Sequence, residues 1–201
     1  MTVRAVVLPA TPLLVPGAAG AAIALGAVRD AVLEPLRRAA GPGTDASAPQ
    51  RWGVLADGAQ DRRGARRASL AAAGMADRWV PDLPGPPVGE PDSAVAGVAA
   101  SIGLWAVGAA AGAPALAGVE VVELAGGADP DAVAAALDVL AAVDVLVVAA
   151  TGPRGPGTAA GRVLAALADR GDWSGRTVEV PVDGPHLLAT YAVTTWEGAA
   201  R

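Results

Sequence analysis

Residues 143–150 read Val-Asp-Val-Leu-Val-Val-Ala-Ala, a nearly continuous apolar run. Such a run is typical of a strand at the centre of a parallel sheet, because helices cover both of its faces. A glycine- and proline-rich loop over residues 151–157 follows, and then a predicted helix over residues 158–170. This strand–loop–helix unit indicates an α/β protein.

Predicted strands and helices alternate along the rest of the chain. The apolar patterns predict strands over residues 3–8, 51–58, 77–80, 119–124, 177–180 and 187–196. Helices are predicted over residues 18–39 and 93–111, and from Asp129 onward. The alternation predicts a single α/β domain over residues 1–201, a three-layer sandwich whose mostly parallel central sheet has helices on both faces.

Several local signals refine these expectations. Asp129 followed by Pro130 is a typical helix start, and Ser93 is the expected cap of the helix that ends near residue 111. Pro35 is expected to bend or end the first helix. The proline-rich segment 81–92 is expected to be irregular and is a candidate rim of a site. The five tryptophans are expected in the core, because the chain has no phenylalanine.

Composition excludes several kinds of chemistry. The chain has 15 basic residues, all arginine, and neither lysine nor cysteine, so it cannot form a Schiff base, a disulfide or a thiolate metal site. The net charge of −5 argues against a nucleic-acid partner. The arginine-rich stretch 61–67 is interpreted as a solvated loop rather than a phosphate site.

Two charge-free stretches, residues 5–28 and 94–119, resemble membrane spans at first sight. Both are rich in alanine and glycine and contain proline, so their insertion into a bilayer is unfavourable. We therefore expect a cytoplasmic protein without a membrane partner.

A glycine-rich loop over residues 152–158 follows the central strand. Its spacing is that of a phosphate-binding P-loop, but the lysine that would reach the outer phosphates is missing. A tight turn before the helix is the simpler interpretation. The amides of Gly155 and Gly157 could still hold an anion with the help of Arg154.

Three further residues are candidates for ligand contact or catalysis. Asp57 closes the second predicted strand and Thr11 follows the first, where parallel strands open onto a ligand site. Asp57 is alternatively a turn residue, and the Thr11 hydroxyl alternatively caps the backbone that follows it. His186, the single histidine, is a candidate acid or base and alternatively a structural or surface residue. One histidine without cysteine cannot supply a two-histidine iron site.

The two ends of the chain carry recognisable motifs. The opening Ala-Val-Val-Leu-Pro-Ala-Thr-Pro-Leu-Leu-Val-Pro-Gly of residues 5–17 resembles the start of actinobacterial class III extradiol ring-cleavage dioxygenase, B-subunit-like proteins. Residues 191–196, Tyr-Ala-Val-Thr-Thr-Trp, resemble the terminal segment of that group. The resemblance implies an α/β fold with a ligand site at the loop after the first strand.

The resemblance also implies a departure from dioxygenase chemistry. Class III extradiol dioxygenases bind Fe(II) through two histidines and a glutamate, and the first histidine lies about where Ala10 and Thr11 stand here. Pro185-His186 likewise stands where the group has a Pro-Tyr-Gly turn. We therefore expect a dioxygenase-like protein without iron or another cofactor.

Three functions remain open at this stage. The first is binding of a small molecule, or service as an assembly subunit, with self-association as a further expectation. The second is a metal-free enzyme in which His186 is the acid or base and Asp57 or Arg154 orients an acidic or phenolic substrate. The third is a phosphate or nucleotide binder that uses residues 152–158.

Overall fold

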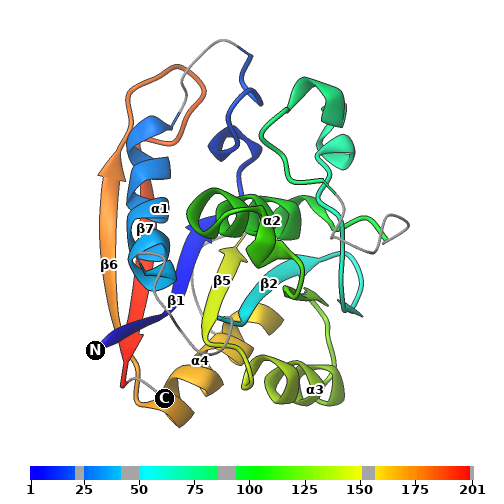
Figure 1. The fold of residues 1–201 in the computed structure, drawn as a ribbon, viewed down its shortest axis with the longest axis vertical. Coiled ribbons are helices and arrows are strands. Elements are labelled where there is room, and N and C mark those ends of the chain that lie inside the picture. The colour runs from blue at the N-terminus through cyan, green and yellow to red at the C-terminus, as the bar shows by residue number, and fades with distance from the viewer. Residues whose placement is uncertain (21–24, 42–49, 86–93, 151–156, 200–201) are drawn as a thin grey trace.

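The computed structural model describes residues 1–20, 25–41, 50–85, 94–150 and 157–199. Within these ranges one seven-stranded sheet lies between two layers of helices (Figure 1). The strands are β1 (Thr2–Pro9), β2 (Trp52–Gly58), β3 (Arg62–Arg63), β4 (Glu120–Ala125), β5 (Val145–Ala150), β6 (Ser174–Pro181) and β7 (Thr190–Gly198). The helices are α1 (Gly26–Ala40), α2 (Val98–Ala111), α3 (Pro130–Leu140) and α4 (Ala159–Gly171), with short 3-10 turns η1 (Pro12–Leu14), η2 (Ala71–Ala73), η3 (Asp77–Trp79) and η4 (Ala113–Leu116).

The strand order of the sheet is β3-β4-β2-β5-β1-β7-β6. The four inner strands, β4, β2, β5 and β1, are parallel. The three outer strands pair antiparallel: β3 with β4, β7 with β1, and β6 with β7. The expected central strand is confirmed, because β5 lies between β2 and β1. The predicted three-layer α/β architecture is also confirmed.

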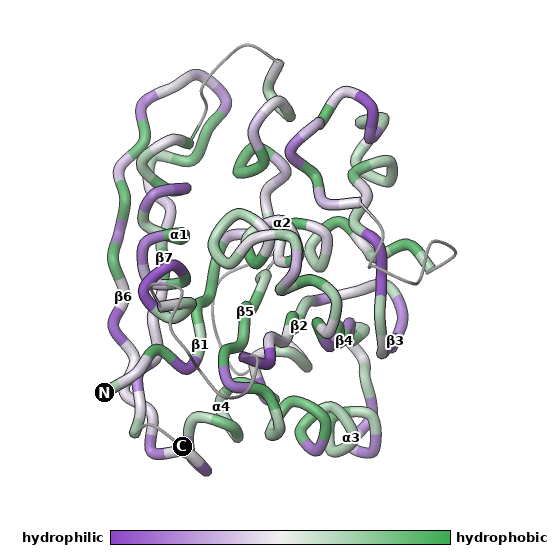
Figure 2. The backbone as a smooth tube through the Cα atoms, viewed as in Figure 1, coloured by the Kyte–Doolittle hydropathy of each residue, from purple (hydrophilic) through white to green (hydrophobic). Residues whose placement is uncertain are grey.

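Two apolar cores lie on opposite faces of the sheet. Val147 of β5 belongs to the core beneath α1 and α2, and its neighbours Leu146 and Val148 belong to the core beneath α3 and α4. This alternation is the pleat of a strand that is covered on both faces. Figure 2 shows that the inner strand β5 is hydrophobic, whereas the outer strand β6 alternates between polar and apolar residues.

The first helix begins later than its apolar pattern predicts. Helix α1 starts at Gly26, after Leu25 with a φ of +56°, and Gly17 and Gly20 also have positive φ. These left-handed residues turn the chain where a helix was expected from residue 18; residues 21–24 lie outside the described ranges. Pro35 does not end the helix, which continues to Ala40.

Helices α3 and α4, which form one of the two helix layers, start as predicted. The carboxylate of Asp129 accepts a hydrogen bond from the Ala132 amide at 2.7 Å, and Pro130 occupies the first turn of α3. The hydroxyl of Thr158 accepts one from the Gly161 amide at 3.0 Å and caps α4. Each cap satisfies an amide that the helix itself leaves unpaired.

Helix α2 is buried on almost every side. Nine of its 14 residues are buried, and Gly97 is its N-cap; the expected cap Ser93 lies outside the described residues. Despite this apolar character, no helix in the described part of the chain is long and apolar enough to cross a membrane.

The predicted strand over residues 77–80 is wrong. These residues form the 3-10 turn η3, because the carboxylate of Asp77 accepts hydrogen bonds from the Ser69 hydroxyl and the Leu70 amide, both at 3.0 Å. Trp79 consequently lies on the surface, 68% exposed, and is not a core residue. The expectation that tryptophans lie in the core is confirmed for Trp52 and Trp105, which are buried.

At the amino end of the inner strands, Arg51 and Asp144 join β2 to β5. The Arg51 amide donates to the Asp144 carboxylate at 2.9 Å, and the Arg51 guanidinium donates to it at 3.4 Å. Partial burial raises the pKa of Asp144, but the hydrogen bonds and the charge of Arg51 outweigh it, so that the pKa lies below its usual value of 3.8. The charged form is thus favoured in the folded state.

We expect Asp144→Asn to lower the free energy of unfolding by up to about 1 kcal/mol at pH 7. A depressed pKa contributes stability above the pKa of the unfolded chain, and that contribution is lost as the pH falls through the folded-state pKa. The difference in the free energy of unfolding between wild type and Asp144→Asn, measured by urea titration, should therefore become smaller as the pH falls from 5 to 3. Asp138→Asn, on the exposed face of α3, is the control. A difference that is constant down to pH 3 would contradict the assignment.

Candidate functional site

The carboxyl ends of β1, β5 and β2 meet at one edge of the sheet. Pro9 pairs with Ala150, and Ala56 pairs with Ala149, so the register places Pro9, Ala150 and Asp57 in one row. Neighbouring strands lie about 4.8 Å apart, which puts the backbones of Pro9 and Asp57 roughly 10 Å from one another. We call this row of three strand ends the switch edge.

The helices that follow these strands along the chain lie on opposite faces of the sheet (Figure 1). The next helix after β1 is α1 and the next after β2 is α2, both in one layer, whereas the next helix after β5 is α4 in the opposite layer. Strand β5 thus lies between two strands whose connections go to the other face. Ligands of open α/β sheets bind at such a reversal, outside the carboxyl ends of the strands.

Thr11 lies just beyond β1 and is half-buried. Its amide donates to the Pro9 carbonyl at 2.8 Å, and its carbonyl accepts from the Leu14 amide at 3.1 Å. The alternative expectation that its hydroxyl caps the following backbone is wrong, because the side chain makes no capping hydrogen bond to η1. Ala10, beside it, is held by its amide to the Ala150 carbonyl at 2.9 Å.

Asp57 lies near the end of β2, also half-buried, and its Oδ1 atom is shielded from solvent. Leu55, two residues earlier, belongs to the core beneath α3 and α4. Side chains two residues apart on a strand share a face, so Asp57 faces the layer of α3 and α4. The chain after Thr11 instead enters the layer of α1 and α2. The structure therefore brings both predicted residues to the switch edge, from opposite faces of the sheet.

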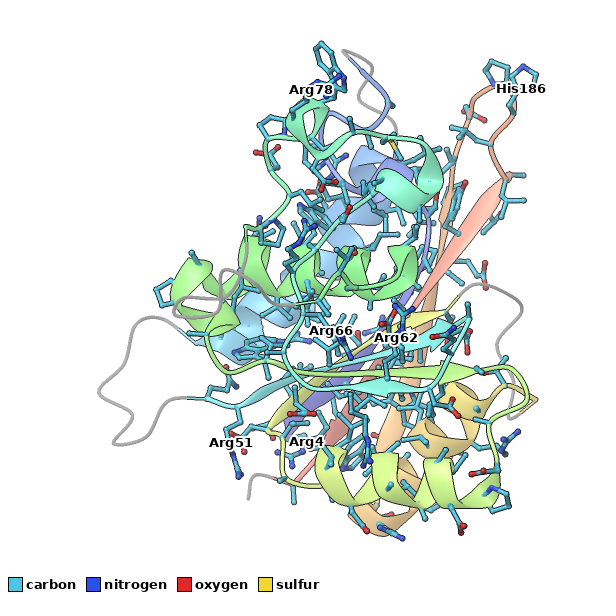
Figure 3. The ribbon with its side chains drawn as sticks, turned by 90° about the vertical axis from the view of Figure 1, so that its right-hand side faces the viewer. Arg4, Arg51, Arg62, Arg66, Arg78 and His186 are labelled. Carbon is cyan, nitrogen blue, oxygen red and sulfur yellow. The ribbon has the colours of Figure 1, made fainter. Side chains whose placement is uncertain are left out.

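The other predicted residues are distributed differently. His186 is exposed, and Figure 3 shows it at the tip of the hairpin between β6 and β7, away from the sheet. Arg154 and Gly155 lie outside the described residues. Gly157 is exposed and precedes Thr158, the residue that caps α4.

A buried glutamate on β4 escaped the sequence analysis. Glu123 is 2% exposed, and its Oε1 atom accepts a hydrogen bond from the Gly97 amide at 2.7 Å. The carboxylate thus lies at the N-terminus of α2, where the helix dipole favours negative charge. Its Oε2 atom is buried without a hydrogen-bond partner among the described residues. A charged residue in the otherwise apolar run 121–124 is the sequence signal that could have marked it.

The arginine-rich stretch 61–67 packs on the protein more closely than a solvated loop would. Arg62, labelled in Figure 3, and Arg63 form β3, and Arg62 pairs with Glu123 in register. Arg66 is half-buried, with its Nε atom shielded from solvent, and donates to the Arg63 carbonyl at 3.2 Å. The solvated-loop interpretation is therefore wrong for Arg62 and Arg66. Sequence reasoning missed the edge strand because two residues are too short to show a period.

Ser69 and Ser101, which have no nucleophile motif around them, have a structural role. The Ser69 amide donates to the Ser101 hydroxyl at 2.9 Å, and that hydroxyl donates in turn to the Ala96 carbonyl at 3.4 Å. Both serines are buried. Their hydrogen bonds hold the segment after β3 against α2.

No three side chains of histidine, aspartate or glutamate in the described ranges come together as a metal-binding group. Comparisons with family models, curated proteins and solved structures find no match for the chain. The site is therefore defined by its geometry: two polar residues at the switch edge, and a buried carboxylate beneath the start of α2.

We expect Glu123→Ala to lower the free energy of unfolding by about 1–3 kcal/mol, because the Gly97 amide would lose its acceptor in a buried place. Glu123→Gln keeps an acceptor oxygen and should cost less. The measurement is the midpoint of urea unfolding at unchanged slope. Glu120→Ala, on the same strand and only half-buried, should stay within about 0.5 kcal/mol of wild type. Equal midpoints for wild type and Glu123→Ala would show that the contact does not stabilise α2.

Proposed function

We propose that the protein binds a small phenolic molecule at the switch edge, on a fold like that of the extradiol dioxygenases. The observation that carries the proposal is the position of Asp57, a half-buried carboxylate at the end of β2 beside the strand where the connections reverse. A carboxylate accepts hydrogen bonds from ligand hydroxyl groups, and such charge-assisted bonds are strong.

The resemblance of residues 5–17 and 191–196 to the dioxygenase group supports the same choice of ligand. In that group the loop after the first strand belongs to the active site, and here it contributes Ala10 and Thr11. Neither side chain is an iron ligand of the kind the group uses. We therefore propose binding of a phenol and not ring cleavage.

Two alternatives stay predictions. An enzyme with His186 as acid or base would need an element that orients the imidazole, whereas His186 is exposed at the tip of the hairpin between β6 and β7. A phosphate or nucleotide site over residues 152–158 depends on Arg154 and Gly155, whose placement is not described. The phenol-binding proposal is preferred because Asp57 and Thr11 both lie at the switch edge.

Titration of the ¹⁵N-labelled protein with catechol tests the proposal. We expect shifts of the amide signals to concentrate at residues 10–11 and 57–58, and at residues 124–125 of β4, which pair with Asp57 and Gly58. Asp57→Asn should weaken binding about tenfold, because it removes one hydrogen bond to a charged acceptor. Asp169→Asn, exposed in the last turn of α4 at the far end of the sheet, is the matched control. Shifts that scatter over the surface, or equal affinities of wild type and Asp57→Asn, would overturn the proposal.

A further inference from the structure

A hollow lies between α1 and α2, apart from the switch edge. We call it the interhelix groove. It encloses about 450 Å³ and is lined by one face of α1, the C-terminal half of α2, η4, Pro16 and residues 81–84. This volume is within the range of small-molecule sites. Part of the proline-rich segment expected to form the rim of a site thus does line a hollow.

The floor of the groove is apolar. Leu33 of α1 and Trp105 of α2 are buried in the adjoining core, and each contributes a part of its surface to the lining. Gly108 and Ala109 follow Trp105 on α2, and the space stays open because glycine has no side chain and alanine has a single methyl group. Leu116 of η4 closes the far side. An aliphatic chain or a flat ring would remove this surface from water.

Two arginines flank the apolar floor. Arg29, Leu33 and Arg37 are spaced four residues apart, so they form one stripe along α1 that lines the groove. Eight residues of helix place the backbones of the two arginines about 12 Å apart. The Nε atom of Arg29 donates to the Leu14 carbonyl at 2.8 Å, which holds its side chain in the wall.

Arg37 is the more accessible of the two cations. It is exposed, and no carboxylate of the described residues lies within ion-pair distance of it. The next residue, Arg38, differs: it pairs with Glu34 and Glu197 and does not line the groove. Asp82 is the single acidic residue of the lining, at the proline-rich rim. The charged residues with which α1 lines the groove are therefore both positive, and they favour an anionic group.

We propose that the interhelix groove binds an amphipathic monocarboxylic acid, with its carboxylate at Arg37 and its apolar chain along Leu33 and Trp105. A planar guanidinium matches a carboxylate with two parallel hydrogen bonds. An extended chain of about eight carbons has the length of the Arg29–Arg37 stripe. The site is independent of the phenol site, since it shares no residue with the switch edge.

Calorimetric titration with octanoate, and with octanol as its neutral analogue, tests this proposal. We expect saturable binding of octanoate, weaker binding of octanol, and a five- to tenfold loss of octanoate affinity in Arg37→Ala, roughly the worth of one charge-assisted contact. Arg38→Ala is the matched control, because it removes the same charge from the same turn of α1 without touching the groove. Ala109→Trp fills the groove from an exposed position, and should abolish binding while the protein stays folded.

Several results would overturn the proposal. They are the absence of saturable octanoate binding, equal affinity for octanol, an equal loss in Arg37→Ala and Arg38→Ala, and undiminished binding by a folded Ala109→Trp. Circular dichroism of each variant establishes that it is folded. Because Asp57→Asn leaves the groove intact, octanoate affinity in that variant should equal that of wild type.

Discussion

The hydrogen bond between the Gly97 amide and the Glu123 carboxylate fixes how α2 lies on the sheet. An amphipathic helix is oriented by its apolar stripe, but α2 is buried nearly all round and has no such stripe. Polar contacts, which have directions, therefore help to set its rotation. The second such contact is at Ser101, whose hydroxyl accepts from the Ser69 amide. Together the two contacts join α2 to the sheet below it and to the chain segment beside it.

Close packing sets the distance between α2 and the sheet. A Cβ atom on Gly103 would lie 2.6 Å from a methyl group of Val54, so that any larger residue would push the helix away from β2. The same helix becomes open toward its C-terminus, where Ala109 is exposed. One small-residue helix thus gives a tight contact at its centre and a groove at its end. Both follow from side-chain volume alone, since neither Gly103 nor Ala109 has a polar side chain.

Features that depend on neighbouring residues could be predicted from the sequence. The buried strand β5, the cap Asp129 and the helix that begins near residue 158 are of this kind, because each depends on a few adjacent side chains. The positions of Asp57 and Thr11 could be predicted for a related reason, since a residue at or just after the end of a parallel strand must lie at the carboxyl edge.

Features that depend on distant contacts could not be predicted. The segment after residue 76 has a strand-like composition, yet the carboxylate of Asp77 bonds to residues 69 and 70 and bends it into a turn. The role of Glu123 could not be predicted, because it depends on a hydrogen bond from Gly97, which is 26 positions earlier in the sequence. The late start of α1 depends on the left-handed conformation of Leu25, a residue type that rarely adopts it.

The position of β7 has a consequence for how the chain folds. Strand β1 lies between β5 and β7, and the Thr2 hydroxyl is bonded to the Gly198 carbonyl, 196 residues away. Proteins dominated by such non-local pairings fold slowly, because a long loop must close before the contact forms. Strand β1 is made before β7, and the backbone amide and carbonyl groups along one of its edges stay unpaired until β7 is available. Until then, a strand of the future core can pair with other chains.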